Sequence, residues 1–356
     1  MNPRVRLWLT IALPVVVVVL VIAVLILRGT GGNANTGTST KAGTQTPQKL
    51  TPMKLALDFT PNPNHTGIYV ALENGWYRDQ GIDMTILPFS QNTFPDTLVG
   101  TGKADVGIGG TEGVVLDAAA DQKIVSIATV TAHNESYLVT RADAPIQRPR
   151  DLDGKIYGGY GAPYETPIMS NVIQHDGGKG TFKSITLGTD AIQALNSHQV
   201  DFAWVFKLDI VAAEHQGIHL KTFAVTNYGV PDYYSPTFIT SQTEITNKSD
   251  LLHRFMTATA KGYEFARQSP QEAAQLLIKG APQGTFPDPK LVEASQQTLS
   301  PLYADTGHRW GIQNAQAWQD YVKFILPTGS VKDTANKTVS QVDSAQLFTN
   351  QFLPAQ

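Results

Sequence analysis

Three turns that follow an apolar run and open a helix-like run contain the residue types that can hold a small ligand. Their sequences are TPNPNHTG (Thr60–Gly67), GGTEG (Gly109–Gly113) and GGYGAPYE (Gly158–Glu165). Such turns direct free backbone N–H groups toward whatever lies beyond the strand. Pro61 and Pro63 leave the first turn few conformations. That stiffness suits a structural turn and a binding loop equally.

Hydrogen-bonding and aromatic side chains lie in or near these turns. Glu112 and Glu165 could accept hydrogen bonds from an amine, although the helix dipole also favours an acid in a first helical turn. His65 could donate a hydrogen bond in a cleft, or could simply start a helix. Tyr160, Trp204 and Tyr234 lie at strand ends or in turns, where a flat ring could stack on them or they could serve packing alone.

Composition and motifs exclude several classes of function. The chain has 27 basic and 30 acidic residues and a net charge of -3, so we expect no nucleic-acid partner. It has no cysteine, which removes disulfides and thiolate chemistry. The sequence contains no paired metal-ligand spacing, no nucleophile elbow and no phosphate loop. We therefore expect no metal, no cofactor and no catalytic residues.

The amino-terminal segment resembles a membrane anchor. Arg4 and Arg6 precede an apolar run, Leu7–Leu27, that is long enough to cross a bilayer as a helix and lacks a small-residue cleavage motif. We expect an uncleaved single-pass anchor (residues 1–28), with a cleaved signal peptide as the alternative. Residues 29–49 are rich in Gly, Thr and Asn and should form a flexible linker. The folded part would then be extracytoplasmic at the cell membrane.

The remainder alternates short apolar runs with amphipathic stretches, which predicts an α/β fold. The expected strands are Lys54–Phe59, Asp83–Pro88, Val106–Gly109, Ile124–Thr131, Tyr137–Arg141, Lys155–Gly158, Ser184–Leu187, Phe202–Val205, Leu220–Val225 and Thr237–Thr240. The expected helices are Thr66–Gln80, Thr93–Thr101, Glu112–Asp121, Tyr164–His175, Thr189–Ser197 and Asp209–Gln216, followed by a mostly helical segment from Lys248 to the end. Two similar strand–helix–strand units imply two lobes with the binding site between them.

Four segments resemble one known family. LDFTPNPNHTGIYVALENGWYRDQGIDMTILP, GTGKADVGIGG, DLDGKIYGGYGAPYETPIM and NYGVPDYYSPTFIT look like the periplasmic-type substrate-binding proteins of ABC importers, most closely the branch that binds formylaminopyrimidine and related thiamine precursors. The resemblance implies a two-lobed type II periplasmic-binding-protein fold that closes on its ligand. Lobe 1 would comprise residues 50–139 and 235–356, and lobe 2 residues 140–234.

The resemblance also implies a function and a site. The protein would act as a monomer that delivers a pyrimidine precursor of thiamine to a membrane permease and performs no chemistry. Trp204 or Tyr234 would stack on the ring. The residues expected to contact the ligand are Asn62, His65, Gly110, Thr111, Gly159, Tyr160, Gly161, Glu165, Trp204 and Tyr234.

Two alternatives remain open. Relatives that bind taurine, alkanesulfonates or nitrate share the GKADVGIGG segment, and an anion would require a cation in the cleft, for which Lys207 is the candidate. A fungal enzyme that makes the thiamine pyrimidine belongs to the same superfamily. Its cofactor-binding lysine and reacting histidine fall on Gly109 and Gly113 here, and its cysteines have no counterpart, so the enzyme is disfavoured.

Overall fold

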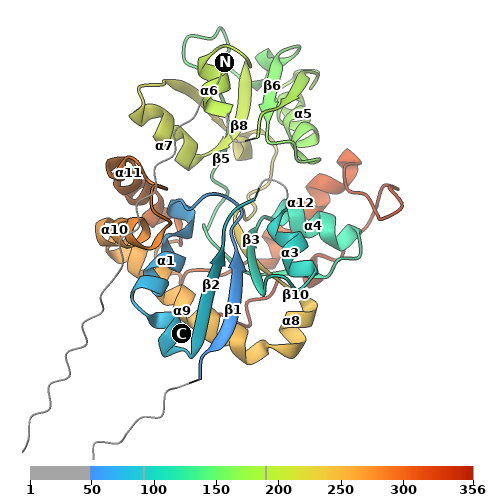
Figure 1. Cartoon of the computed structure of the whole chain (residues 1–356). Coiled ribbons are helices and arrows are strands. Elements are labelled where there is room, and N and C mark those ends of the chain that lie inside the picture. Colours follow the sequence, from blue (N-terminus) through green and yellow to red (C-terminus); the bar gives the residue numbers. More distant parts are fainter. Residues whose placement is uncertain (1–48, 91–92, 189–190, 356) are drawn as a thin grey trace, which may run out of the picture. The chain divides into compact units, whose positions relative to one another are not determined.

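The computed structural model describes residues 49–90, 93–188 and 191–355 (Figure 1). Its strands are β1 (Thr51–Ala56), β2 (Ile82–Leu87), β3 (Val106–Gly109), β4 (Ile124–Thr129), β5 (Ser136–Arg141), β6 (Ile156–Gly159), β7 (Lys183–Thr186), β8 (Phe202–Phe206), β9 (Leu220–Ala224) and β10 (Thr237–Ser241). All ten strands expected from the sequence are confirmed, with ends that differ by up to three residues.

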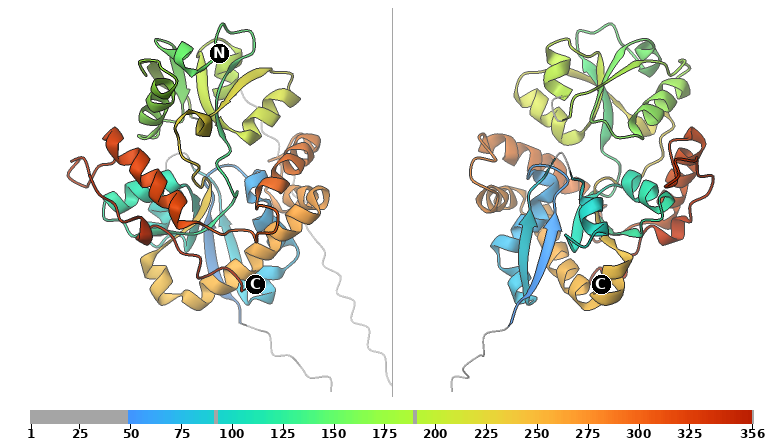
Figure 2. Two further views of the ribbon diagram at one scale, coloured as in Figure 1. Left: turned by 180° about the vertical axis from the view of Figure 1, so that it is seen from behind. Right: turned by 45° about the vertical axis from the view of Figure 1, so that its right-hand side comes forward.

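The strands form two five-stranded sheets. The first has the order β2-β1-β3-β10-β4, in which β10 runs antiparallel to β3 and β4. The second has the order β7-β6-β8-β5-β9, in which β5 runs antiparallel to β8 and β9. The chain enters the second sheet after β4 and returns to the first with β10, so two segments connect the sheets (Figure 2). The α/β class with two sheets is therefore confirmed.

Helices cover the faces of both sheets (Figure 1). They are α1 (Thr66–Glu73), α2 (Trp76–Asp79), α3 (Pro95–Gly100), α4 (Thr111–Ala119), α5 (Glu165–His175), α6 (Ala191–Asn196), α7 (Lys207–His215), α8 (Gln242–Asn247), α9 (Ser249–Gln268), α10 (Pro270–Gly280), α11 (Pro289–Leu299) and α12 (Ala315–Ile325). Helices α1, α4, α5 and α7 each begin shortly after a strand of their sheet, as in other α/β units.

Two expectations about helices were wrong. The helix expected over Thr66–Gln80 is two helices, because Gly75 adopts φ 74° between α1 and α2, a conformation that ends a helix and that glycine tolerates. The carboxyl-terminal region is mostly helical only as far as the 3₁₀ turn Leu326–Thr328, and a single 3₁₀ turn, Ser344–Gln346, follows it among the described residues. Residues 329–355 mostly lack helix, and part of this segment lies along β4 through hydrogen bonds of Ser126 with Leu347 and Thr349.

No helix among the described residues is long and apolar enough to cross a membrane. The expected anchor, residues 1–28, and most of the expected linker lie outside the described residues.

The largest apolar core lies where α1 and α9 pack against the first sheet. Tyr263 of α9 stacks on Trp310, with ring centroids 4.1 Å apart and planes within 5°. The crossing of α1 and α9 is close because glycines meet there: a Cβ on Gly262 would lie 1.9 Å from the carbonyl oxygen of Gly67. This packing fixes the start of α1, and thereby the turn that precedes it.

Candidate functional site

The turns at the carboxyl ends of strands in the two sheets meet within the folded unit. Phe94, just before α3, packs edge-on against Tyr160, which follows β6, with ring centroids 6.3 Å apart. His215 at the end of α7 lies 2.7 Å from Asp288, the residue that caps α11. Burial and the nearby charges of Asp58 and Glu165 raise the pKa of Tyr160. The third predicted turn therefore lies near Phe94 and near Asp58, which precedes the first turn.

The first turn is held by its own polar side chains. The Asn62 carboxamide accepts a hydrogen bond from the Asn64 N–H at 2.9 Å and donates one to the Thr60 carbonyl at 3.0 Å. His65 is fully buried. Its Nδ1 accepts the Asn62 N–H, so its Nε2 carries the proton and donates to Asp58 Oδ1 at 2.8 Å. In this conformation both ring nitrogens of His65 are used inside the turn.

Aromatic hydroxyls fix the same turn from outside. Tyr263 donates to the Asn64 carbonyl at 2.6 Å, and Tyr303 donates to the Pro63 carbonyl at 2.5 Å. Both tyrosines are fully buried. The turn is therefore a rigid edge of the site that presents Asn62 and Asp58.

The second turn binds the segment that returns from the second sheet. Thr111 donates both its N–H and its hydroxyl to the Tyr234 carbonyl, at 3.1 and 2.7 Å. The Tyr234 hydroxyl accepts the Asn314 N–H at 2.8 Å. A Cβ on Gly110 would lie 2.4 Å from Glu112 Oε2 and 2.8 Å from the Ser235 hydroxyl oxygen, so a side chain there would displace those groups. Gly110, Thr111 and Tyr234 are thus brought together, with Tyr234 almost fully buried.

The third turn is organised around Glu165. One carboxyl oxygen accepts from the Tyr157 hydroxyl at 2.7 Å and the Tyr160 N–H at 2.9 Å, and the other accepts from the Ala162 N–H at 2.6 Å. A Cβ on Gly159 would lie 2.2 Å from the Glu165 carboxyl, and Gly161 adopts φ 102°. Glu165 therefore shapes the turn.

Aromatic rings line the second sheet's side of the site. The ring of Trp204 lies edge-on to Tyr164, with centroids 6.2 Å apart, and its Nε1 is buried without a hydrogen-bond partner among the described residues. Trp204 and Tyr160 therefore border the region where Phe94 meets the third turn. Tyr234 lies instead with Thr111 and Asn314. Phe94 was not among the residues predicted to form the site. The only feature of the sequence that could have indicated it is its place directly before a helix that begins with a proline.

A buried acid lies beneath the second turn. Glu112 is 3% exposed and accepts a hydrogen bond from the Tyr233 hydroxyl at 2.6 Å. Burial raises the pKa of Glu112 despite that hydrogen bond and another from Ser235. Tyr321 of α12 stands against Tyr233 with ring centroids 4.4 Å apart, and its hydroxyl has no partner among the described residues. This part of the site is apolar, aromatic and acidic.

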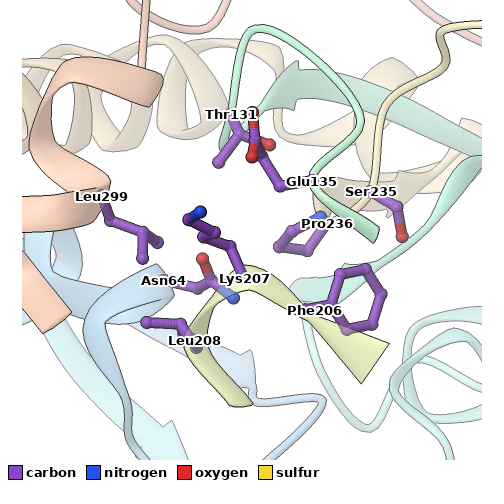
Figure 3. A pocket seen from close by; sticks show the side chains of 9 residues that line it. All are labelled: Asn64, Thr131, Glu135, Phe206, Lys207, Leu208, Ser235, Pro236 and Leu299. Carbon is purple, nitrogen blue, oxygen red and sulfur yellow. The ribbon is translucent and has the colours of Figure 1, made fainter. Parts of the chain in front are cut away.

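Lys207 lies at the junction between the two sheets (Figure 3). It lines a cavity of about 10 Å³, which has room for about one water molecule. Its ammonium lies 5.6 Å from the Tyr137 ring centroid. Burial raises the pKa of Glu135, and the positive charge of Lys207 partly opposes that rise. Lys207 thus faces a carboxylate and a ring, a poor arrangement for receiving an anion.

The described residues contain no group of three or more side chains placed to hold a metal ion. A lysine at Gly109 would be crowded, because a Cβ there would lie 3.0 Å from Ile239. The chemistry available at the site is hydrogen bonding by carboxyls and backbone N–H groups, together with contact to aromatic rings.

The chain is similar to a known family and to known proteins over most of its length. Residues 62–273 match the model of the family described as NMT1/THI5 like. A formylaminopyrimidine-binding protein of Halalkalibacterium halodurans is 26% identical over 78% of this chain and 86% of that protein. A 4-amino-5-hydroxymethyl-2-methylpyrimidine phosphate synthase of Legionella pneumophila is 24% identical over 84% of this chain and 92% of that protein.

Solved structures establish the fold. The periplasmic aliphatic sulphonate binding protein SsuA of Escherichia coli matches with a TM-score of 0.62 at 14% identity, over 85% of this chain and 92% of that one. The two-sheet architecture is therefore the periplasmic-binding-protein fold, as the resemblance implied.

Proposed function

The chain belongs to the NMT1/THI5-like family, and from this premise we propose that it is the extracytoplasmic substrate-binding protein of an ABC importer for a pyrimidine precursor of thiamine. The ligand would be formylaminopyrimidine or hydroxymethylpyrimidine. The observation that supports this choice best is the combination of aromatic rings, Trp204 and Tyr160 among them, with the buried carboxyl of Glu112 where the strand-end turns of the two sheets meet.

A pyrimidine matches this combination chemically. Its flat ring can stack on Trp204 or Tyr160, as aromatic pairs do. Its amino group and ring nitrogens need donors and acceptors, which the Asn62 carboxamide and the N–H groups of Gly110 and Gly161 would supply. His65 and Glu165 would not contact the ligand; they would fix the conformation of the turns whose other groups bind it.

Binding would be coupled to closure of the two lobes, because the ligand groups come from turns of both sheets. A membrane permease would then recognise the closed form and receive the ligand. The proposed anchor at residues 1–28 would keep the protein at the membrane surface, and one copy would suffice for binding.

A thermal-shift panel tests this proposal. The full chain, purified in detergent, is heated with formylaminopyrimidine, hydroxymethylpyrimidine, thiamine or taurine. A ligand that binds only the folded state raises the melting temperature, so the proposal predicts a rise with the pyrimidines and none with taurine. A rise with taurine alone would instead favour an anion-binding protein.

A second function is favoured by one observation, the similarity to the Legionella pneumophila synthase over most of both chains. In that case the protein would make the pyrimidine with a lysine-bound pyridoxal phosphate. The residue that matches the cofactor-binding lysine of the fungal enzyme is Gly109 here, which has no amine to form the aldimine. Adding pyridoxal phosphate and recording the visible spectrum decides the matter: an aldimine band that disappears on borohydride reduction would support the enzyme, and its absence supports the binding protein.

A further inference from the structure

A recess over Gly113 of α4 has a carboxyl on each side. Asp117 lies one helical turn beyond Gly113, and therefore on the same face of the helix. Asp96, in the first turn of α3, approaches from the other side. Its Oδ2 lies 3.5 Å from the position of a Cβ on Gly113, and beyond the neighbouring backbone no other atom lies within 4 Å of that position. The glycine thus leaves open space between two acids.

Asp117 is buried, and one of its carboxyl oxygens lacks a hydrogen bond. It is 9% exposed, and its Oδ2 has no hydrogen-bond partner in the described part of the chain. Neither Asp117 nor Asp96 takes part in the ion pairs found among the described residues. Burial, assisted by the charge of Asp96, raises the pKa of Asp117 to about 8. Near neutral pH its carboxyl therefore offers both an O–H donor and a C=O acceptor.

Further unpartnered atoms border the same region. Trp204 Nε1 and the Tyr321 hydroxyl are buried without partners in the described residues, and Tyr321 is fully buried. Tyr164 connects them. Its ring contacts Trp204, and its pKa is raised by burial and by charges that include Glu112 and Asp96. The pKa of Tyr321 is raised by burial, by Glu112 and by Tyr164. Leaving a buried polar atom without a hydrogen bond costs free energy, and two such atoms belong to residues that interact with Tyr164.

We propose that Asp117 binds the amino group and the adjacent ring nitrogen of a planar heterocycle that enters over Gly113, with Asp96 as a second acceptor for the amino group. This inference rests on the proposed function and specifies which ligands the site accepts. The carboxyl O–H of Asp117 donates to the ring nitrogen, and its C=O accepts an amino hydrogen, with no net proton transfer. A 4-oxo analogue has an acceptor oxygen in place of that amino group, which would face the acceptor oxygens of Asp96 without a proton between them, so it binds less tightly. Because Asp117 Oδ2 is covered in this conformation, the ligand enters a more open arrangement of the lobes.

Calorimetric titration of the full chain with 4-amino-5-hydroxymethyl-2-methylpyrimidine and its 4-oxo analogue tests the inference. The wild-type protein should bind the amino compound at least about 10-fold more tightly than the oxo compound. Asp117→Leu should weaken amino binding by about 10- to 100-fold. Asp117→Asn keeps one donor and one acceptor and should stay within about threefold of wild type. Asp79→Leu, the same change at an exposed acid of α2, should have no effect.

Two further results complete the test. Gly113→Leu fills the recess and should abolish binding without lowering the melting temperature. Wild-type affinity in Asp117→Leu, or equal losses in Asp117→Leu and Asp117→Asn, would overturn the inference while leaving the proposed function intact. If the wild-type protein binds neither compound and no formylaminopyrimidine, both fail together.

Discussion

At the scale of single residues, polar side chains that were predicted to contact a ligand already form hydrogen bonds with other groups of the protein. His65 was identified from the turn it occupies, yet both of its ring nitrogens bond within that turn. Glu165 likewise accepts three hydrogen bonds from its own turn and strand. Spacing along the chain could show that these residues lie at strand ends. It could not show which groups would form hydrogen bonds with them, because those partners depend on the backbone conformation of each turn.

The proposed stacking of the ligand on Trp204 gives a direct prediction. Trp204→Ala should weaken binding of formylaminopyrimidine at least about 10-fold, because a stacked ring contributes roughly 1 kcal/mol or more beyond its buried area. The melting temperature without ligand should change little, since Trp204 is only partly buried. Titration calorimetry measures both affinities.

Trp76→Ala is the matched control, because Trp76 is also partly buried but lies on α2, where it packs against Lys261 and Phe265. Equal affinity loss in both variants would mean that the effect of Trp204 is a general loss of stability.

Glycines at the crossing of α1 and α9 give a prediction at the scale of elements. Gly262→Ala should lower the free energy of unfolding by about 1 to 3 kcal/mol, because its Cβ would overlap the backbone of Gly67 and force the helices apart. Denaturant unfolding measures the change. Gly100→Ala is the control: its Cβ would meet only ordinary contacts at 3.5 Å or more, so its stability should be unchanged or higher. Similar losses in both would contradict the close crossing.

The segments that connect the two sheets contain a titratable group. His133 lies between Asp232 and Asp305, at 2.5 and 3.0 Å, and these carboxylates raise its pKa above the usual value of 6.5 despite partial burial. A raised folded-state pKa stabilises the protein below the unfolded-state pKa, and that stabilisation is lost as the pH rises through the folded-state pKa. His133→Gln should therefore lower the melting temperature at pH 6 and have little effect at pH 9.

Melting curves of both proteins across that range check this prediction. A His133→Gln effect of the same size at both pH values would show that charge on His133 does not hold the connecting segments.

The strands and their order of appearance could be predicted from the sequence because apolar alternation is a local property. The break at Gly75 was missed because the residues on both sides of it continue the apolar helical spacing. The pairing of residues 347–349 with β4 could not be foreseen, since it joins segments far apart in the chain. For the same reason the contact between Glu112 and Tyr233 could not be foreseen, nor could the approach of Asp96 to Asp117.

At the scale of the whole molecule, we propose that the strand-end turns of the two sheets jointly enclose a flat ligand. Contacts between them, such as Phe94 with Tyr160 and His215 with Asp288, already exist in this conformation. We expect the ligand to stabilise this closed arrangement. Small-angle scattering of the full chain should show a smaller radius of gyration with saturating formylaminopyrimidine than without it, whereas an unchanged or larger radius would contradict closure.

The most direct test of the central claim is calorimetric titration of the full chain with formylaminopyrimidine. We expect saturable binding of one ligand per chain, competition by hydroxymethylpyrimidine and no competition by taurine. Absence of measurable heat and of competition at millimolar pyrimidine, in a preparation whose cooperative unfolding shows that it is folded, would contradict it.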